Sequence, residues 1–96
     1  MDFSMICAHA TGVASRQIDG EVLLVDLQRS TLQVLNPVGA RLWDLIDGQR
    51  TVADLAEVLF AEYAVGLEQA RADVQAFCED LLYRNMLTVV ERLSRI

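Results

Sequence analysis

The side chains of this chain that can support covalent or metal chemistry are few and widely spaced. Two cysteines, Cys7 and Cys78, lie near opposite ends of the 96 residues, and His9 is the single histidine. A metal site needs several ligands brought together, and nucleophilic or acid–base catalysis needs partner groups within hydrogen-bond reach. We therefore expect no metal site, no cofactor and no enzymatic activity, and we interpret His9 as a surface residue.

Cys78 falls on the apolar side of a predicted helix, and Glu79 and Asp80 follow it directly. Reactive thiols occupy electropositive and exposed environments, so we interpret Cys78 as a small buried hydrophobe. Neighbouring helical residues do not face each other, which excludes Glu79 and Asp80 as a catalytic carboxylate pair. Because the cysteines lack a C-x-x-C spacing, they are interpreted as free thiols in a reducing cytoplasm.

The composition narrows the class of protein further. A chain of 96 residues with 53% hydrophobic residues is expected to fold as one domain. The formal net charge is −6, and all eight basic residues are arginine. Such a balance argues against binding nucleic acid or an anionic membrane surface. No apolar run approaches the roughly 20 residues of a membrane span, and the N-terminus lacks the features of a signal peptide, so we expect a cytoplasmic protein.

Three strands are predicted in the first third of the chain. Val13–Ile18 has the character of a weak edge strand, and Asp19-Gly20 is a strong signal for a two-residue turn. Glu21–Leu27 is apolar on both sides, as expected of a strand flanked by partners. Thr31–Leu35 alternates with a period of two, and this pattern predicts a half-buried strand.

Three helices are predicted to follow. Asn36 suits the N-cap of the first helix and Pro37 its first position, so we expect this helix over Val38–Ile46. The second helix is expected to begin after Thr51, where a hydroxyl is followed three residues later by a carboxylate. The third is expected from Leu67 to about residue 85, before a short apolar stretch at 86–90 that suits a last strand.

The order of these elements predicts the fold class. Three antiparallel strands followed by three helices indicate an α+β fold, and the closely spaced helices resemble a winged helix-turn-helix. Residues 1–11 show no clear period and are expected to form a flexible tail. The folded domain is expected over 12–91, with a C-terminal tail at 92–96.

The most promising functional feature is an open sheet edge. The two hairpin connections put Glu21–Leu27 in the middle of the sheet and leave Thr31–Leu35 at an edge. Unpaired backbone groups at such an edge can accept another chain as an added strand. If the third helix packs beside this edge, its apolar side would line a groove. The alternative is that these residues belong to the core, and for Phe77 and Leu81 the core is the preferred interpretation. The candidate peptide-binding residues are Thr31, Leu32, Gln33, Val34, Leu35, Val74, Phe77, Cys78 and Leu81.

Two alternatives follow from the same pattern. The winged-helix outline suggests a transcriptional regulator, but 67–84 contains four acidic and two basic residues, a net charge of −2. A recognition helix of that sign would be repelled by phosphates. The other alternative is a structural module that forms a homodimer by pairing its open edge with a second copy.

Two long segments carry a resemblance to a known family. Residues 22–56 read V-L-L-V-D-L-Q-R-S-T-L-Q-V-L-N-P-V-G-A-R-L-W-D-L-I-D-G-Q-R-T-V-A-D-L-A, and 72–87 read A-D-V-Q-A-F-C-E-D-L-L-Y-R-N-M-L. In their order and spacing these segments resemble the PqqD family, and the resemblance extends over about 12–90. No single short motif is decisive, whereas the combination is fairly specific.

The resemblance implies a function and partners. Members of this family bind the leader segment of a ribosomally made, post-translationally modified peptide and present it to a modifying enzyme. The leader is then expected to add as a strand beside Thr31–Leu35, in a groove against the third helix. The expected partner enzyme is a radical SAM protein in PQQ biosynthesis, or a leader protease and cyclase in lasso-peptide biosynthesis.

Overall fold

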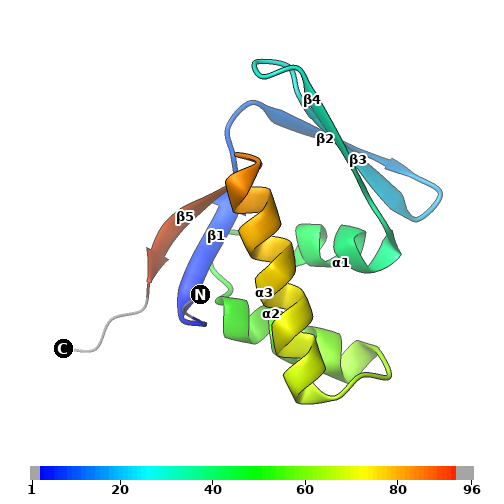
Figure 1. Ribbon diagram of the computed structural model, residues 1–96, viewed down its shortest axis with the longest axis vertical. Helices are drawn as coiled ribbons and strands as arrows, with labels where there is room; N and C mark the ends of the chain where they lie inside the picture. Colours follow the sequence, from blue (N-terminus) through cyan, green and yellow to red (C-terminus); the bar gives the residue numbers. More distant parts are fainter. Residues whose placement is uncertain (1–2, 93–96) are drawn as a thin grey trace.

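The computed structural model describes residues 3–92, and within them strands come first and last with three helices between (Figure 1). The elements are β1 (Met5–His9), β2 (Val13–Ile18), β3 (Glu21–Asp26), β4 (Thr31–Leu35), α1 (Pro37–Leu45), α2 (Val52–Glu62), α3 (Leu67–Tyr83) and β5 (Leu87–Arg92). The predicted α+β class is confirmed, because antiparallel strands are segregated from helices along the chain. The likeness to a winged helix remains a prediction.

Strands β2, β3 and β4 form an antiparallel sheet in that order, at the upper right of Figure 1. The turn between β2 and β3 is Asp19-Gly20, and both residues have positive φ, at 50° and 83°. Such values identify a type I′ turn, whose twist suits a two-residue hairpin. The predicted central place of β3 and edge place of β4 are therefore confirmed.

Residues 3–11 differ from the expected flexible tail. Met5–His9 form β1, which pairs antiparallel with β5 in a second sheet. Met5, Ile6 and Cys7 are all buried, and the Cys7 carbonyl accepts a hydrogen bond from Gly48 N–H at 3.2 Å. The backbone of this segment is hydrogen-bonded to β5 on one side and to Gly48 on the other. Both partners are distant in the sequence, so no local pattern predicts this strand. Residues 1–2, and 93–96 of the expected C-terminal tail, lie outside the described residues.

The helix starts agree with the predicted caps. Asn36 Oδ1 accepts the N–H of Gly39 at 2.8 Å, with Pro37 in the first turn of α1. Thr51 and Asp54 form a reciprocal capping box at the start of α2. The first cap matters for the site, because it joins the end of β4 directly to α1.

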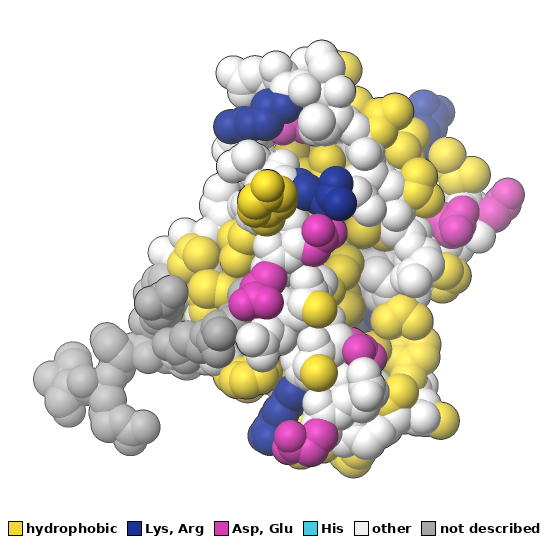
Figure 2. Space-filling model, viewed as in Figure 1, with side chains coloured by type: hydrophobic (Ala, Val, Ile, Leu, Met, Phe, Trp, Pro, Cys, Tyr) yellow, Lys and Arg dark blue, Asp and Glu magenta, His cyan; other side chains and the backbone are white. Residues whose placement is uncertain are grey.

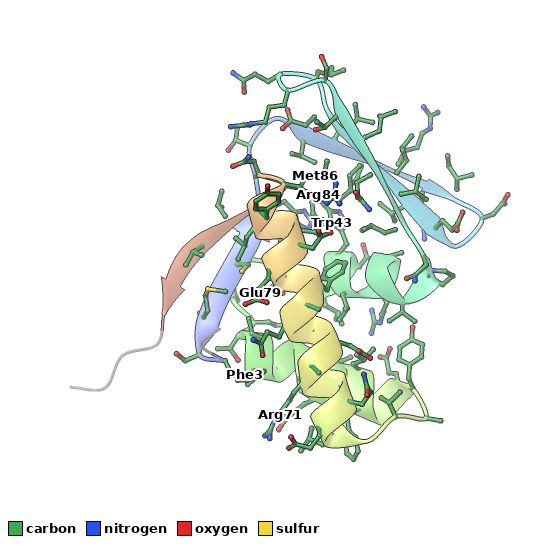
Figure 3. All side chains as sticks on the ribbon, in the orientation of Figure 1. Phe3, Trp43, Arg71, Glu79, Arg84 and Met86 are labelled. Atoms are coloured by element: carbon green, nitrogen blue, oxygen red, sulfur yellow. The ribbon has the colours of Figure 1, made fainter. Side chains whose placement is uncertain are left out.

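One core holds both sheets and the helices together. The inner face of β3, with Val22 and Leu24, packs toward α1, and α3 packs against α2 and β5. Trp43 and Met86 are buried, whereas Arg71, Glu79 and Arg84 are exposed charged residues around α3 (Figure 3). Across residues 3–92, no helix has the length and apolar character required to cross a bilayer.

Candidate functional site

The direction of the backbone groups of β4 follows from the β2–β3 turn. In a two-residue hairpin the residues that flank the turn, Ile18 and Glu21, form a hydrogen-bonded pair. Since such pairs alternate along antiparallel strands, Glu21, Leu23 and Val25 direct their backbone groups to β2. The intervening residues of β3 therefore bond to β4.

The open edge of β4 is formed by Leu32 and Val34. The register pairs Leu24 of β3 with Gln33 of β4, so Gln33 directs its backbone groups inward and its two neighbours direct theirs away from the sheet. The exposed Val34 carbonyl also accepts a contact from Gln33 Nε2 at 3.4 Å. Two N–H donors and two carbonyl acceptors are thus available to an added strand.

The side chains of β4 alternate between two faces as predicted. Leu35 is buried at 5% exposure and Gln33 is half-buried, on the face toward α1. Leu32 and Val34 lie on the opposite face, with 66% and 58% of their surface exposed. Thr31 is also exposed. Large apolar side chains that stay exposed beside an open edge mark this strand as a place where a partner can dock.

A hollow of about 330 Å³ lies where β4 ends and α1 begins, against α3. The residues that line it are Asn36, Val38, Gly39, Leu42, Asp73 and Phe77. Its wall from α3 is the half-buried Phe77, and its wall from α1 includes Gly39. The hollow is mainly apolar and lies next to Asn36, the residue that follows β4.

The predicted α3 face divides into core and surface. Val74, Cys78 and Leu81 are fully buried, with exposures of 0%, 0% and 1%, so these three contribute to the core rather than to a groove wall. Phe77 alone among the four predicted residues borders the hollow. The reason is that the apolar stripe of α3 is wider than its contact with the core, and Phe77 lies at its margin.

The residues that α1 contributes to the hollow were not among the sequence-based candidates. Val38, Gly39 and Leu42 come from the first turns of α1. One signal could have indicated them, because a glycine within a helix is unfavourable and often marks a close approach of another group. At Gly39 that group is Phe77.

Charged side chains of both signs lie along α3 beside this site, where Glu68 and Asp80 are paired with Arg71 and Arg84. Asp73 lies at the rim of the hollow and accepts a hydrogen bond from Gln69 Nε2 at 2.7 Å. Figure 2 shows Asp and Glu side chains along the exposed face of α3, with hydrophobic side chains beside them. A ligand strand with basic residues next to its apolar ones would match this pattern.

The two cysteines meet in the core, although the sequence separates them widely. Both are free and buried, Cys7 in β1 and Cys78 in α3. The interaction with the Cys7 thiol, followed by burial, raises the pKa of the Cys78 thiol far above its ordinary value. A thiol held in its neutral form is a poor nucleophile, in agreement with the interpretation of Cys78 as a core residue.

His9 is exposed but not free of contacts. Its ring stacks on Trp43 with centroids 3.6 Å apart and an interplanar angle of 3°, and its Nε2 donates to the Trp43 carbonyl at 2.8 Å. Through these two contacts with Trp43, His9 attaches β1 to α1, a structural role that the sequence did not indicate.

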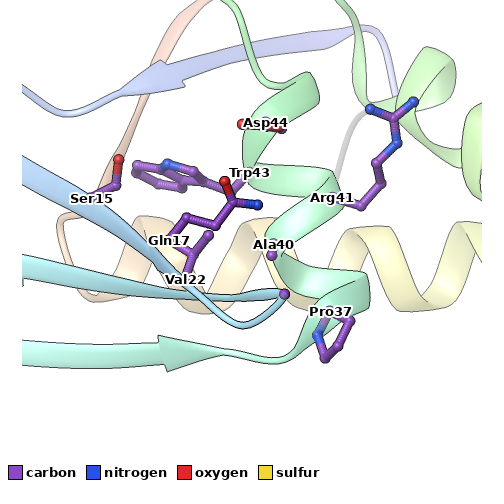
Figure 4. Close-up of a pocket in the computed structure, with 9 residues that line it drawn as sticks. Ser15, Gln17, Val22, Pro37, Ala40, Arg41, Trp43 and Asp44 are labelled. Carbon is purple, nitrogen blue, oxygen red and sulfur yellow. The ribbon is translucent and has the colours of Figure 1, made fainter.

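A second hollow lies between α1 and the β2–β3 hairpin. In it Trp43 lies beside Ser15 and Gln17 (Figure 4).

Comparison with known proteins establishes the family. The model of the family described as Coenzyme PQQ synthesis protein D (PqqD) matches residues 21–87. The chain belongs to the PqqD family. Among solved structures, it is similar to "TbiB1 in Complex with the TbiA(beta) Leader Peptide", with 30% identity, a TM-score of 0.78, and coverage of 83% of this chain and 93% of that one.

A second solved structure supports the fold of this PqqD-family chain. It is "Lasso peptide synthetase B1 complexed with the leader peptide", with 23% identity and a TM-score of 0.78 over 85% of this chain and 96% of that one. No curated protein matches the chain. The family match includes β3, β4 and all three helices, which are the elements that form the open edge and the hollow.

Proposed function

We propose that this protein binds the leader segment of a ribosomally made precursor peptide by adding it as a strand to β4. The observation that carries the proposal is the open edge, where Leu32 and Val34 offer paired donors and acceptors to an incoming backbone. The similar protein TbiB1 is bound to a leader peptide, and a shared fold at 30% identity supports the same class of ligand here.

In this proposal the backbone of Thr31–Leu35 fixes the register of the leader, and the hollow beside Phe77 takes one of its apolar side chains. An extended chain places alternate side chains on opposite faces, so every second leader residue would point toward α1 and α3. Phe77 packs against the core cluster to which Val74, Cys78 and Leu81 belong. Burial of apolar surface in the hollow then adds to the affinity of the backbone hydrogen bonds.

We further propose that the chain presents the leader to a separate modifying enzyme and does not itself catalyse the modification. The neutral Cys78 thiol and the His9 ring bound to Trp43 are occupied in the fold. The partner would be a radical SAM protein, or a leader protease with a cyclase, and the complex would form in the cytoplasm, where both thiols stay reduced.

The test is a fluorescence-anisotropy titration with the labelled leader of the precursor encoded beside this protein. Saturable one-to-one binding is expected, and a folded protein that gives no saturable signal would refute the proposal. Light scattering over a concentration series, run on the same samples, would reveal a homodimer that uses the edge instead. A gel shift at low salt should show no binding to DNA.

A further inference from the structure

The face of the three-stranded sheet that points away from α1 is apolar next to the open edge. Residues directly opposite each other in an antiparallel sheet have side chains on the same face. The register places Leu23 opposite Val34 and Val25 opposite Leu32. Leu23 and Val25 are half-buried, and Leu32 and Val34 are mostly exposed. Two short apolar rows thus run from β3 to β4 and end at the edge where a strand would add.

An added strand would extend both rows. Leu32 and Val34 supply the backbone groups of the edge, so the ligand residues beside them would be their direct neighbours. Direct neighbours share a face, and these two ligand side chains would therefore lie on the outer face, against Leu32 and Val34. The ligand residue between them would lie beside Gln33 and face the opposite way, toward the side where Phe77 borders the hollow.

We propose that Leu32 and Val34 are specificity-determining residues, which select apolar, β-branched or aromatic side chains at two leader positions spaced two residues apart. This inference rests on strand addition to β4. It requires apolar leader residues on the outer face of the sheet as well as in the groove. The protein would then discriminate against leaders that present polar residues outward, even when their groove-facing residues fit.

The energetic argument is the loss of exposed apolar surface at the edge. Leu32 and Val34 are each flanked on one side by an apolar neighbour in β3 and on the other by the open edge. A matching side chain on the ligand would bury the remaining flank, and cross-strand apolar pairs stabilise sheets relative to alanine pairs. The expected gain is about two- to fivefold in affinity for each position.

The test uses leader titrations of three single variants, Leu32→Thr, Val34→Thr and Ile18→Thr. Threonine keeps the backbone N–H and the strand propensity while it removes apolar contact. Ile18 lies on the same outer face but on β2, at the far edge of the sheet, and has a comparable exposure of 49%. It is therefore the matched control. A serine scan of the leader provides the complementary data.

We expect Leu32→Thr and Val34→Thr to weaken leader binding about two- to fivefold each, with Ile18→Thr unchanged. The serine scan should show two sensitive outward positions interleaved with the groove-facing ones. If the wild type binds but both β4 variants bind equally well, or if Ile18→Thr weakens binding as much, this inference is overturned and strand addition stands. If the wild type binds no leader, strand addition fails as well.

Discussion

Phe77 of α3 lies against the backbone of Gly39 in the first turn of α1. A Cβ added to Gly39 would stand 3.3 Å from Phe77 Cε1 and 3.3 Å from Asn36 Oδ1. This close approach brings α3 near the end of β4, and it forms one side of the hollow beside the open edge. Glycine at this position therefore controls the width of the hollow.

The first prediction concerns Gly39→Ala. The added methyl group should displace the Phe77 ring and narrow the hollow, while alanine improves helix propensity by about 1 kcal/mol. We expect the thermal midpoint to move by less than about 8 °C, and leader affinity to fall about fivefold, which corresponds to about 1 kcal/mol. Gly66→Ala is the control, because its methyl group would meet nothing within 4 Å. Unchanged leader affinity in Gly39→Ala would show that the hollow does not contribute to leader binding.

The second prediction concerns Asp26, a buried carboxylate at the end of β3. Its Oδ1 accepts the N–H groups of Gln28 and Arg29 at 3.1 and 3.2 Å, and its Oδ2 contacts Arg29 Nη1 at 3.3 Å. Asp26→Ala should lower the free energy of unfolding by about 1–3 kcal/mol, because two backbone hydrogen bonds to the buried carboxylate are lost. Arg29→Ala should cost less than about 1 kcal/mol, since the arginine is half-exposed. If urea denaturation gave the two variants equal losses of unfolding free energy, the backbone hydrogen bonds of Asp26 would not be the main contribution.

The open edge could be predicted from sequence because its signals are local. A period of two in Thr31–Leu35, a turn at Asp19-Gly20 and a cap at Asn36 each depend on a few adjacent residues. Together they define which strand is central and which lies at the edge. The structure adds the direction of the backbone groups, which depends on the register of both hairpins.

The features that could not be predicted depend on distant contacts. In β1 three consecutive residues, Met5, Ile6 and Cys7, are buried, with a bulge between Ile6 and Cys7, so no alternation appears. Its partner β5 comes from the other end of the chain. Similarly, the helical stripe of α3 shows which side is apolar, but not that Phe77 remains at the surface while its neighbours enter the core.

The third prediction concerns Val34→Pro. Proline removes an N–H that faces the open edge, so the sheet should tolerate it with a change in stability below about 1 kcal/mol. Leader affinity should fall at least about tenfold, since a backbone hydrogen bond and the extended path of the ligand are both lost. Val34→Ala keeps the N–H and should bind more tightly than Val34→Pro. Undiminished affinity in the proline variant would place the binding site elsewhere.

The fourth prediction concerns the rate of association. With a net charge of −6 and Asp73 at the rim of the hollow, a leader or partner with basic residues should associate faster at low salt. Stopped-flow measurements between about 0.01 and 1 M ionic strength should show this decline. Asp73→Asn should flatten the salt dependence, whereas Glu57→Gln, exposed on α2, should alter it less. A rate insensitive to salt would show that the charge serves solubility alone.

The central claim is that the leader adds as a strand to β4, and amide hydrogen exchange followed by NMR tests it most directly. In the free protein, the amides of Leu32 and Val34 should exchange quickly, because they face the open edge, while Gln33 is protected by β3. With saturating leader, Leu32 and Val34 should become protected and Gln33 should stay so. Binding that leaves the exchange of Leu32 and Val34 unchanged would contradict strand addition to β4.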